Sequence, residues 1–315
     1  MTSAVVFAYH DVGVRCLKVL LDAGVEVRLV VTHDDNPNEA IWFQSVAALA
    51  AEHGLPCIAP TQPNSDEVLA LVRAAAPDFL FSFYYRQMLG STLLAVPTRG
   101  AYNMHGSLLP RYRGRAPVNW ALLHGERETG ASLHVMDVKP DHGALVGQCA
   151  VPILADDTAH EVFGKVTLAA EIVLAHVLPG LIDGSAVLTP QDLRLGSYFG
   201  GRKPEDGRIP KGAAAQAIHN LVRAVAPPHY PGAFFDSGGL RFVIGRTRVV
   251  GLPGTAPAAD RLADRFALAP RDGCLWLDAA DGGRLRVLAA SLDGEALDAA
   301  AYTARFGTTA RVADA

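Results

Sequence analysis

The chain has 315 residues, 50% of them apolar, which is enough for one large or two medium domains with a packed core. Its formal net charge is −4 and its pI is about 6.2, whereas a nucleic-acid-binding protein more often has a basic stripe or a pI above roughly 9. Polar residues interrupt every apolar run, and the N-terminus lacks a basic segment followed by a long apolar one, so we expect a cytoplasmic protein without membrane insertion.

The first part of the chain alternates short apolar runs with segments of helical periodicity. Strands are expected at 5–8, 27–31, 56–59 and 79–83, and helices around 14–21 and over 41–53 and 66–75. This alternation indicates an α/β fold, a Rossmann-like doubly wound parallel sheet with right-handed crossovers. Only Gly13 follows the first strand, without a G-x-G-x-x-G pattern, so a nicotinamide cofactor is not supported.

The composition of the chain changes after a long helix expected over 158–178. Residues 191–211 are polar and rich in Gly and Pro, which is typical of a linker. After a helix near 213–225, short β-like runs with turn signals indicate a small barrel or sandwich; they cover 234–235, 240–245, 248–251, 274–277 and 285–289. We therefore expect a first domain at 1–190, a linker at 191–211, a second domain at 212–305 and a tail at 306–315.

Four cysteines are scattered along the chain without a C-x-x-C pair; they are Cys16, Cys57, Cys149 and Cys274. That spacing argues against a zinc site or a disulfide framework. The histidines show no metal-ligand spacing either, so we expect no metal.

The most informative stretch runs from Ala101 to Pro117 and is followed by Asp141 in a Pro-Asp-His-Gly turn. Asn103 and His105 are two residues apart, so in an extended segment their side chains point to the same face. An amide could then polarise an oxygen while an imidazole moves a proton at the same centre. The three residue types suit a reaction in which a carbonyl is attacked and a tetrahedral oxyanion must be held.

The pattern Asn103-x-His105-x-Ser107-Leu-Leu-Pro110, with Asp141 downstream, resembles the folate-dependent formyltransferases. The similarity extends to four further segments in the right order, at 5–11, 81–86, 222–225 and 231–234. Within the family, the chain resembles the formyltransferase half of the bifunctional polymyxin-resistance enzyme, which formylates UDP-4-amino-4-deoxy-L-arabinose. The resemblance implies a formyltransferase domain with an OB-like C-terminal barrel, and transfer of formyl from N10-formyltetrahydrofolate to an amine.

The resemblance also assigns roles to individual residues. Asn103 would stabilise the oxyanion, His105 would carry the proton, and Asp141 would be its electrostatic partner. A nearby carboxylate favours the imidazolium, so we expect Asp141 to raise the pKa of His105. Taken singly, each of these residues is more often a turn or structural residue; their joint occurrence favours catalysis.

Other residues match family segments around the substrates. Contacts with the folate are implied for Gln87, Met88, Leu89, Arg115, Asp137, Val138, Lys139 and Pro140. Met88 and Leu89 could equally belong to the core. Contacts with the acceptor are expected for Tyr9, His10, Arg202 and Lys203, because the first two follow a strand end and the last two could meet a diphosphate. A solvated hinge is the alternative for Arg202 and Lys203.

Several alternatives stay open. A nucleotide-linked amino sugar is the expected acceptor, in lipid A modification; another nucleotide-linked amino-deoxy sugar, or methionyl-tRNA, would require the same chemistry. The fold could also serve a folate-binding protein without turnover. The chain stops at Ala315, so we expect the decarboxylating activity of the bifunctional enzyme on a separate chain. Residues 208–211 lack the aromatic that the family commonly has there, which bears on acceptor specificity.

Overall fold

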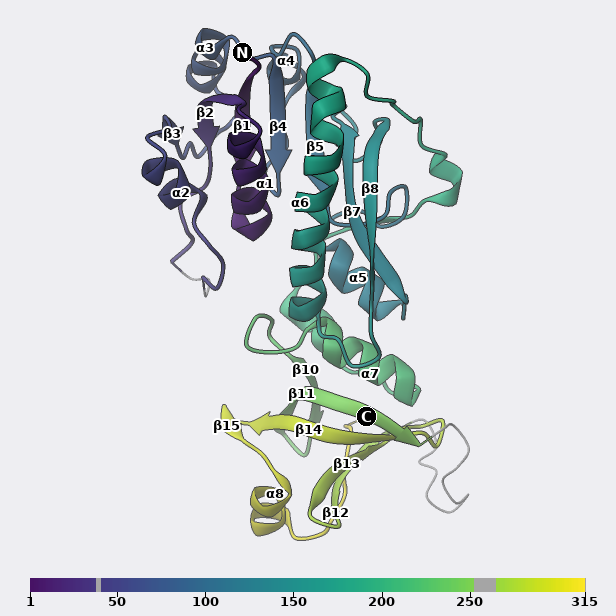
Figure 1. Cartoon of the computed structure of the whole chain (residues 1–315). Coiled ribbons are helices and arrows are strands. Elements are labelled where there is room, and N and C mark those ends of the chain that lie inside the picture. Colours follow the sequence, from purple (N-terminus) through teal and green to yellow (C-terminus); the bar gives the residue numbers. More distant parts are fainter. Residues whose placement is uncertain (38–40, 252–264, 315) are drawn as a thin grey trace. The chain divides into compact units, whose positions relative to one another are not determined.

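The computed structural model describes residues 1–37, 41–251 and 265–314, and the chain divides into two compact units (Figure 1). Unit 1 comprises Met1–Pro117, Glu128–Pro152 and Phe163–Gly200. Unit 2 comprises Val118–Arg127, Ile153–Val162 and Gly201–Ala315. Residues 191–200, which the sequence analysis assigns to a linker, therefore lie within unit 1.

Unit 1 is built on a seven-stranded sheet of order β3-β2-β1-β4-β5-β7-β8. Its strands are β1 (Ser3–Ala8), β2 (Glu26–Val31), β3 (Cys57–Ile58), β4 (Phe79–Phe83), β5 (Ala101–His105), β7 (Glu128–Val135) and β8 (Leu145–Pro152). The first five pair in parallel, and β7 and β8 are antiparallel additions. The predicted doubly wound sheet is confirmed, with an antiparallel extension that the sequence analysis did not predict.

The helices of unit 1 follow the alternation expected from the sequence. They are α1 (His10–Asp22), α2 (Val46–Glu52), α3 (Asp66–Ala75), α4 (Ser91–Leu94) and, from Phe163 onward, α6 (Ala159–Asp183). Gly13 lets α1 approach β1, because a Cβ there would lie 3.1 Å from Cβ of Ala8. The helix expected over 41–53 begins only after Ser45, whose hydroxyl accepts a hydrogen bond from the amide of Ala48 at 3.2 Å.

The core of unit 1 lies between the sheet and its helices. Phe7, Val31 and Leu80 from neighbouring parallel strands are buried with Val72 of α3. Burying one such side chain contributes about 1.5–3 kcal/mol. These contacts hold the strands in register, and the loops at their carboxyl ends are fixed with them.

Helix α6 is long and rich in apolar residues. Among the described residues it is the one helix long and apolar enough, by length and composition, to cross a membrane, although 44% of that window is buried in the folded chain. Its Glu171 forms an ion pair with Arg15 of α1, and Figure 1 shows α6 lying along β5, β7 and β8.

Unit 2 contains an antiparallel sheet of order β10-β11-β14-β13-β12-β16. Its strands are β10 (Ala233–Ser237), β11 (Leu240–Gly251), β12 (Ala267–Arg271), β13 (Cys274–Asp278), β14 (Arg284–Leu292) and β16 (Arg311–Val312), with β15 (Glu295–Ala296) on β14. Beyond β16, the amide of Asp314 donates to the carbonyl of Asp236 in β10 at 2.8 Å. The sheet thereby nearly closes on itself, as expected for the smaller barrel domain.

Two details of unit 2 differ from the sequence analysis. The runs at 240–245 and 248–251 belong to one strand, β11, whose pairing with β14 shifts register between Ile244 and Thr247. The tail assigned to 306–315 contains β16, because Arg311 and Val312 pair with β12 at the edge of the sheet. The unit also holds α7 (Ala215–Ala224), which packs against β11, and α8 (Ala299–Phe306).

Candidate active site

Strands β5 and β7 bring the polar residues of the motif together. Asn103 and His105 lie on one face of β5, and the antiparallel register places His134 opposite Asn103 and Ser132 opposite His105. His105, Ser132 and His134 are all buried. Buried polar side chains at neighbouring register positions are costly unless they are paired, so this face of the sheet differs from an apolar core and is the candidate site.

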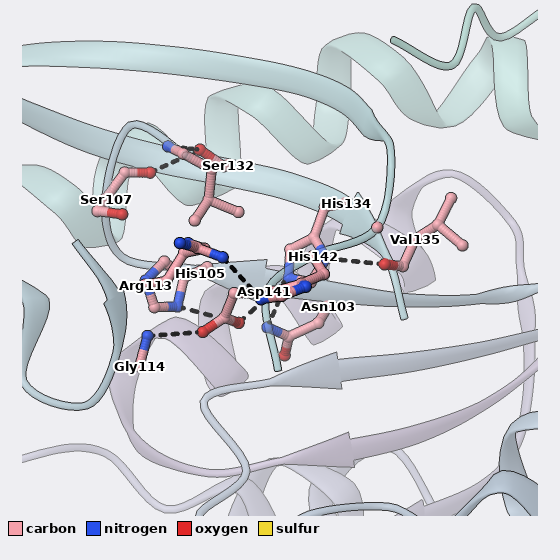
Figure 2. A network of polar contacts seen from close by, with 12 residues as sticks. Asn103, His105, Ser107, Arg113, Gly114, Ser132, His134, Val135, Asp141 and His142 are labelled. Atoms are coloured by element: carbon pink, nitrogen blue, oxygen red, sulfur yellow. Dashed lines mark hydrogen bonds and ion pairs between the residues drawn. The ribbon is translucent and has the colours of Figure 1, made fainter. Parts of the chain in front are cut away.

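Asn103 is oriented by His134. The amide nitrogen Nδ2 of Asn103 lies 3.1 Å from Nε2 of His134, and Nδ1 of His134 lies 2.8 Å from the carbonyl oxygen of Val135 (Figure 2). We assign the hydrogen of His134 to Nδ1, which donates to Val135, so Nε2 accepts from Asn103. The second hydrogen on the Asn103 amide is then left for a further acceptor, such as a developing oxyanion.

Asp141 lies in the loop that follows β7, with a backbone φ of 58°. Its Oδ2 accepts a hydrogen bond from the amide of Gly114 at 2.8 Å, and its Oδ1 lies 3.5 Å both from Nδ1 of His105 and from Nε2 of His134 (Figure 2). Gly114 has φ 95°, and a Cβ there would overlap the carbonyl oxygen of Phe199. Only glycine lets this amide reach the carboxylate.

The electrostatics of the pair correct one prediction. Burial lowers the pKa of His105 below its usual value, and the attraction of Asp141 opposes this without overcoming it. The predicted effect of Asp141 is therefore present, but the net shift is downward because desolvation of the ring is larger. For Asp141, burial on its own would raise the pKa, yet the nearby rings of His105 and His134 and the hydrogen bond from the Gly114 amide together lower it below the usual carboxyl range.

His105 can take up a proton at a defined atom. Its Nε2 lies 2.8 Å from the carbonyl oxygen of Tyr112, so we assign the hydrogen of the neutral ring to Nε2. Nδ1 then carries the lone pair, on the side of Asp141. A proton arriving at Nδ1 would form an imidazolium that the ionised Asp141 stabilises.

A buried network fixes the loop that follows β5. The hydroxyl of Ser132 donates to the carbonyl of Ser107 at 2.6 Å and accepts from the amide of Leu109 at 3.1 Å. Gln148 of β8 donates through Nε2 to the carbonyl of Leu109 at 2.9 Å. Gly106 is equally constrained, because a Cβ there would overlap the hydroxyl of Tyr84. The loop is thereby anchored to β7 and β8 and packed against Tyr84, which follows β4.

Arg113, not Arg115, lies in this polar network. Arg113 is buried, and its Nη1 lies 2.6 Å from Nε2 of His142, the residue after Asp141 (Figure 2). Arg115 is exposed, and its amide donates to the carbonyl of Phe199 at 2.9 Å. Arg113 thus supports the loop of Asp141, while the side chain of Arg115 is accessible to a ligand.

The segments expected to contact the folate lie in loops of unit 1. Leu89 is buried in the core, whereas Met88 and Val138 are 55% and 62% exposed. Gln87 donates to the carbonyl of Thr61 at 3.4 Å, and Asp137 accepts from the amide of Val138 at 2.5 Å. Lys139 is exposed and Pro140 half-buried. The core alternative is therefore correct for Leu89 and wrong for Met88.

Tyr9 and His10 belong to an aromatic cluster after β1. The His10 ring stacks on Phe43 at 3.9 Å, and Tyr9 contacts Phe43 edge-on at 5.1 Å and donates its hydroxyl to Asp35 at 2.8 Å. Phe43 precedes α2, in the stretch that the sequence analysis assigned to a helix. Aromatic packing with His10 is the physical reason why the chain is not helical there.

Arg202 and Lys203 belong to unit 2. The guanidinium of Arg202 lies 4.9 Å from the centre of the Trp120 ring and donates to the carbonyl of Asp206 at 2.8 Å. Lys203 is exposed, and its amide donates to Asp206 at 2.7 Å. The half-buried guanidinium of Arg202 therefore packs against Trp120 and is not a solvated hinge charge, and burial lowers its pKa.

Sequence reasoning missed His134. The signal was present, since Ser132 and His134 are two residues apart, as polar residues on one face of a strand are, but the strand itself was not predicted.

Within residues 1–37, 41–251 and 265–314, no group of three His, Cys, Asp or Glu side chains could hold a metal ion.

Comparisons with known proteins agree with this fold. Residues 10–178 match the formyl transferase family, and residues 202–307 match the formyl transferase C-terminal domain. Among solved structures, an N-formyltransferase from Helicobacter canadensis, in complex with folinic acid and dTDP-3-aminofucose, is 17% identical with a TM-score of 0.68, covering 91% of this chain and 99% of that one. WlaRD, a sugar 3N-formyltransferase solved with dTDP and 5-N-formyl-THF, is 16% identical with a TM-score of 0.67, covering 94% and 99%.

At these identities the structural likeness shows the fold, and the family match spans more than half of the chain. The chain therefore belongs to the formyl transferase family, as an enzyme of the formyltransferase class.

Proposed function

We propose that this protein transfers the formyl group of N10-formyltetrahydrofolate to the amine of a nucleotide-linked amino sugar. The observation that carries the proposal is the convergence of Asn103, His105 and Asp141 on one buried polar face. Two solved relatives are sugar N-formyltransferases seen with folate derivatives and a dTDP ligand, which supports both substrate classes.

The residues fit the chemistry atom by atom. The acceptor nitrogen forms a bond to the formyl carbon, and the carbonyl oxygen becomes an oxyanion that accepts the second hydrogen of the Asn103 amide. One such donor is worth about 10²–10³ in rate. The proton of the attacking amine passes to Nδ1 of His105, which then gives it to N10 of the folate as the oxyanion collapses and the bond between N10 and the formyl carbon breaks, an assistance worth about 10²–10⁴.

Asp141 acts on this step through charge. Its pKa is held below the usual range, so it stays ionised while His105 is protonated. At 3.5 Å from Nδ1, it stabilises the imidazolium more than the neutral ring. Asp141 therefore favours the protonated intermediate without taking the proton itself.

For the acceptor, the preferred candidate is UDP-4-amino-4-deoxy-L-arabinose, in lipid A modification, with contacts at Tyr9 and His10. This rests on the sequence resemblance. A dTDP-linked 3-amino sugar is the second candidate, because both solved relatives were studied with dTDP ligands.

Methionyl-tRNA is disfavoured by how the arginines of unit 2 are used. Arg208 and Arg241 both bind Asp236, at 2.7 and 2.9 Å, and Arg271 and Arg284 both bind Asp278, at 3.0 and 2.9 Å. A surface that neutralises RNA phosphates needs cations that are not already paired.

The test offers the protein N10-formyltetrahydrofolate with UDP-4-amino-4-deoxy-L-arabinose, dTDP-3-aminofucose and methionyl-tRNA in parallel. Mass spectrometry then follows the gain of a formyl group on each acceptor. Formylation of the UDP sugar supports the full proposal, and formylation of the dTDP sugar alone supports only the chemistry and the substrate class. Formylated tRNA alone, or folate binding without any product, would overturn it.

A further inference from the structure

One face of α6 is exposed to solvent although its side chains are apolar. Leu168 and Ile172 are 55% and 58% exposed, and they lie one helical turn apart in a row with Gly164, Ala175 and Pro179. A helix that is apolar on all sides is normally buried on all sides. The opposite face, including Val166, Val173 and Leu174, already packs in the core of unit 1.

The charges on this stretch of α6 are engaged within the chain. Between residues 164 and 179 the charged side chains are Lys165 and Glu171. Lys165 donates through Nζ to the carbonyl of Pro152 at 3.1 Å, and Glu171 is bound by Arg15 at 2.7 Å. The exposed face of α6 therefore carries no net charge that would attract an oppositely charged partner. Two copies of this face would not repel each other.

The edge of the sheet lies beside this face. Strand β8 ends the strand order of unit 1, and α6 packs closely on it, since a Cβ at Gly147 would lie 2.6 Å from a methyl group of Val177. A groove of about 490 Å³ runs between the two elements, lined by β8 residues with Ile172, His176 and Val187. Val187 is 78% exposed, so the apolar surface continues past the helix.

The open part of β8 can be located from its register. Ile153 donates to Arg127 of the preceding loop at 2.9 Å, so by alternation the amides of Gln148 and Ala150 point away from β7. Thr189 pairs with Leu145 at one end of the strand. An unpaired edge is complemented by another extended strand, and natural proteins rarely leave one bare beside an apolar surface.

We propose that the surface formed by β8, the exposed row of α6 and Val187 is the self-association interface of this protein, occupied by the same surface of a second copy. An antiparallel β8–β8 pairing about a two-fold axis would satisfy both edges at once and bring the two α6 rows together. Residues 164–179 of α6 extend about 24 Å and β8 about 26 Å. A face roughly 25 by 20 Å buries on the order of 1,000 Å² in total, which lies below the roughly 1,200–2,000 Å² of stable complexes and corresponds to a weak, reversible dimer.

Sedimentation velocity of the whole protein over the micromolar range tests the proposal. The expected result is a dimer that Ile172→Glu weakens by about 30-fold or more, because a charge would enter the centre of the interface. Leu71→Glu is the matched control, since Leu71 is an exposed leucine of α3, 42% accessible, on another surface. Circular dichroism melting checks that both variants fold.

Two further measurements distinguish a second copy of the chain from a lipid surface as the partner of this face. Hydrogen exchange at Gln148 and Ala150 should slow as the protein concentration rises, and should stay fast in Ile172→Glu. A wild-type monomer throughout the concentration range would overturn the proposal, as would a dimer that Ile172→Glu leaves unchanged. Flotation of monomeric wild-type protein with phosphatidylcholine–phosphatidylglycerol vesicles would also overturn it, by assigning the face to a lipid surface.

Discussion

Nδ2 of Asn103 lies 3.1 Å from Nε2 of His134, its direct cross-strand partner on β7. The histidine is itself fixed by the Val135 carbonyl. One amide hydrogen of Asn103 therefore binds His134, and the other is available to a substrate oxygen. The residue proposed to stabilise the oxyanion is thus positioned from the neighbouring strand.

His134→Ala should therefore lower kcat by about 10- to 100-fold with little change in the KM for the folate, because Asn103 would lose its orientation and not its donor. His134→Gln can place an acceptor near the position of Nε2 and should recover part of the loss. Steady-state kinetics of both variants check this. Equal losses in the two variants would mean that His134 has a general structural role.

The pH dependence of kcat should follow His105. The base must be neutral to accept the proton, so activity is lost as the pH falls through its pKa, which burial places below the usual 6.5. In Asp141→Asn the upward influence of the carboxylate is gone, so the acid limb should move to still lower pH while the maximal rate falls. A limb that moves to higher pH would contradict the assignment. The profile is measured with saturating substrates.

Acid should also destabilise unit 1. The pKa of His105 is lowered in the folded state, so its contribution to stability is lost as the pH falls below the unfolded value of about 6.5. The pKa of Asp141 is lowered too, so its contribution is present above about 3.9 and lost below that. His105→Gln should therefore flatten the dependence of the unfolding free energy on pH between about 6.5 and 4. Urea titrations at several pH values measure this, and an unchanged slope would contradict it.

Gly106→Ala should destabilise the protein by about 1–3 kcal/mol, because the new methyl group would overlap the Tyr84 hydroxyl. Tyr84→Phe removes the clashing oxygen, so the double variant should be more stable than the sum of the two single effects. A double-mutant cycle in urea measures the coupling. Additive effects would show that the loop relaxes in another direction.

Strands made of apolar residues could be predicted from the sequence. Strand β7, which contributes Ser132 and His134 to the candidate site, could not. Phe79–Phe83 is apolar apart from Ser82, which predicts a buried strand. Strand β7 places Ser132 and His134 inward, so its apolar alternation is broken by the residues that make the site. The spacing of Asn103 and His105 predicted their common face, because alternation in a strand is local.

Properties that depend on distant packing could not be read from the sequence. The downward pKa shift of His105 reflects how completely the ring is desolvated, which no spacing reveals. Trp42 and Phe43 have helical periodicity with the residues after them, yet both contact His10, which is far away in sequence. The docking of Arg311 and Val312 on β12 is likewise a long-range pairing at the end of the chain.

The most direct measurement of the central claim is transfer of a ¹³C-labelled formyl group from N10-formyltetrahydrofolate to UDP-4-amino-4-deoxy-L-arabinose, followed by mass spectrometry. Wild type, Asn103→Ala and His105→Ala are compared with His53→Ala, an exposed histidine of unit 1, as the control. We predict labelled sugar with wild type and His53→Ala, and at least about 100-fold slower transfer in the other two variants. Near-normal transfer by folded Asn103→Ala and His105→Ala would contradict the account.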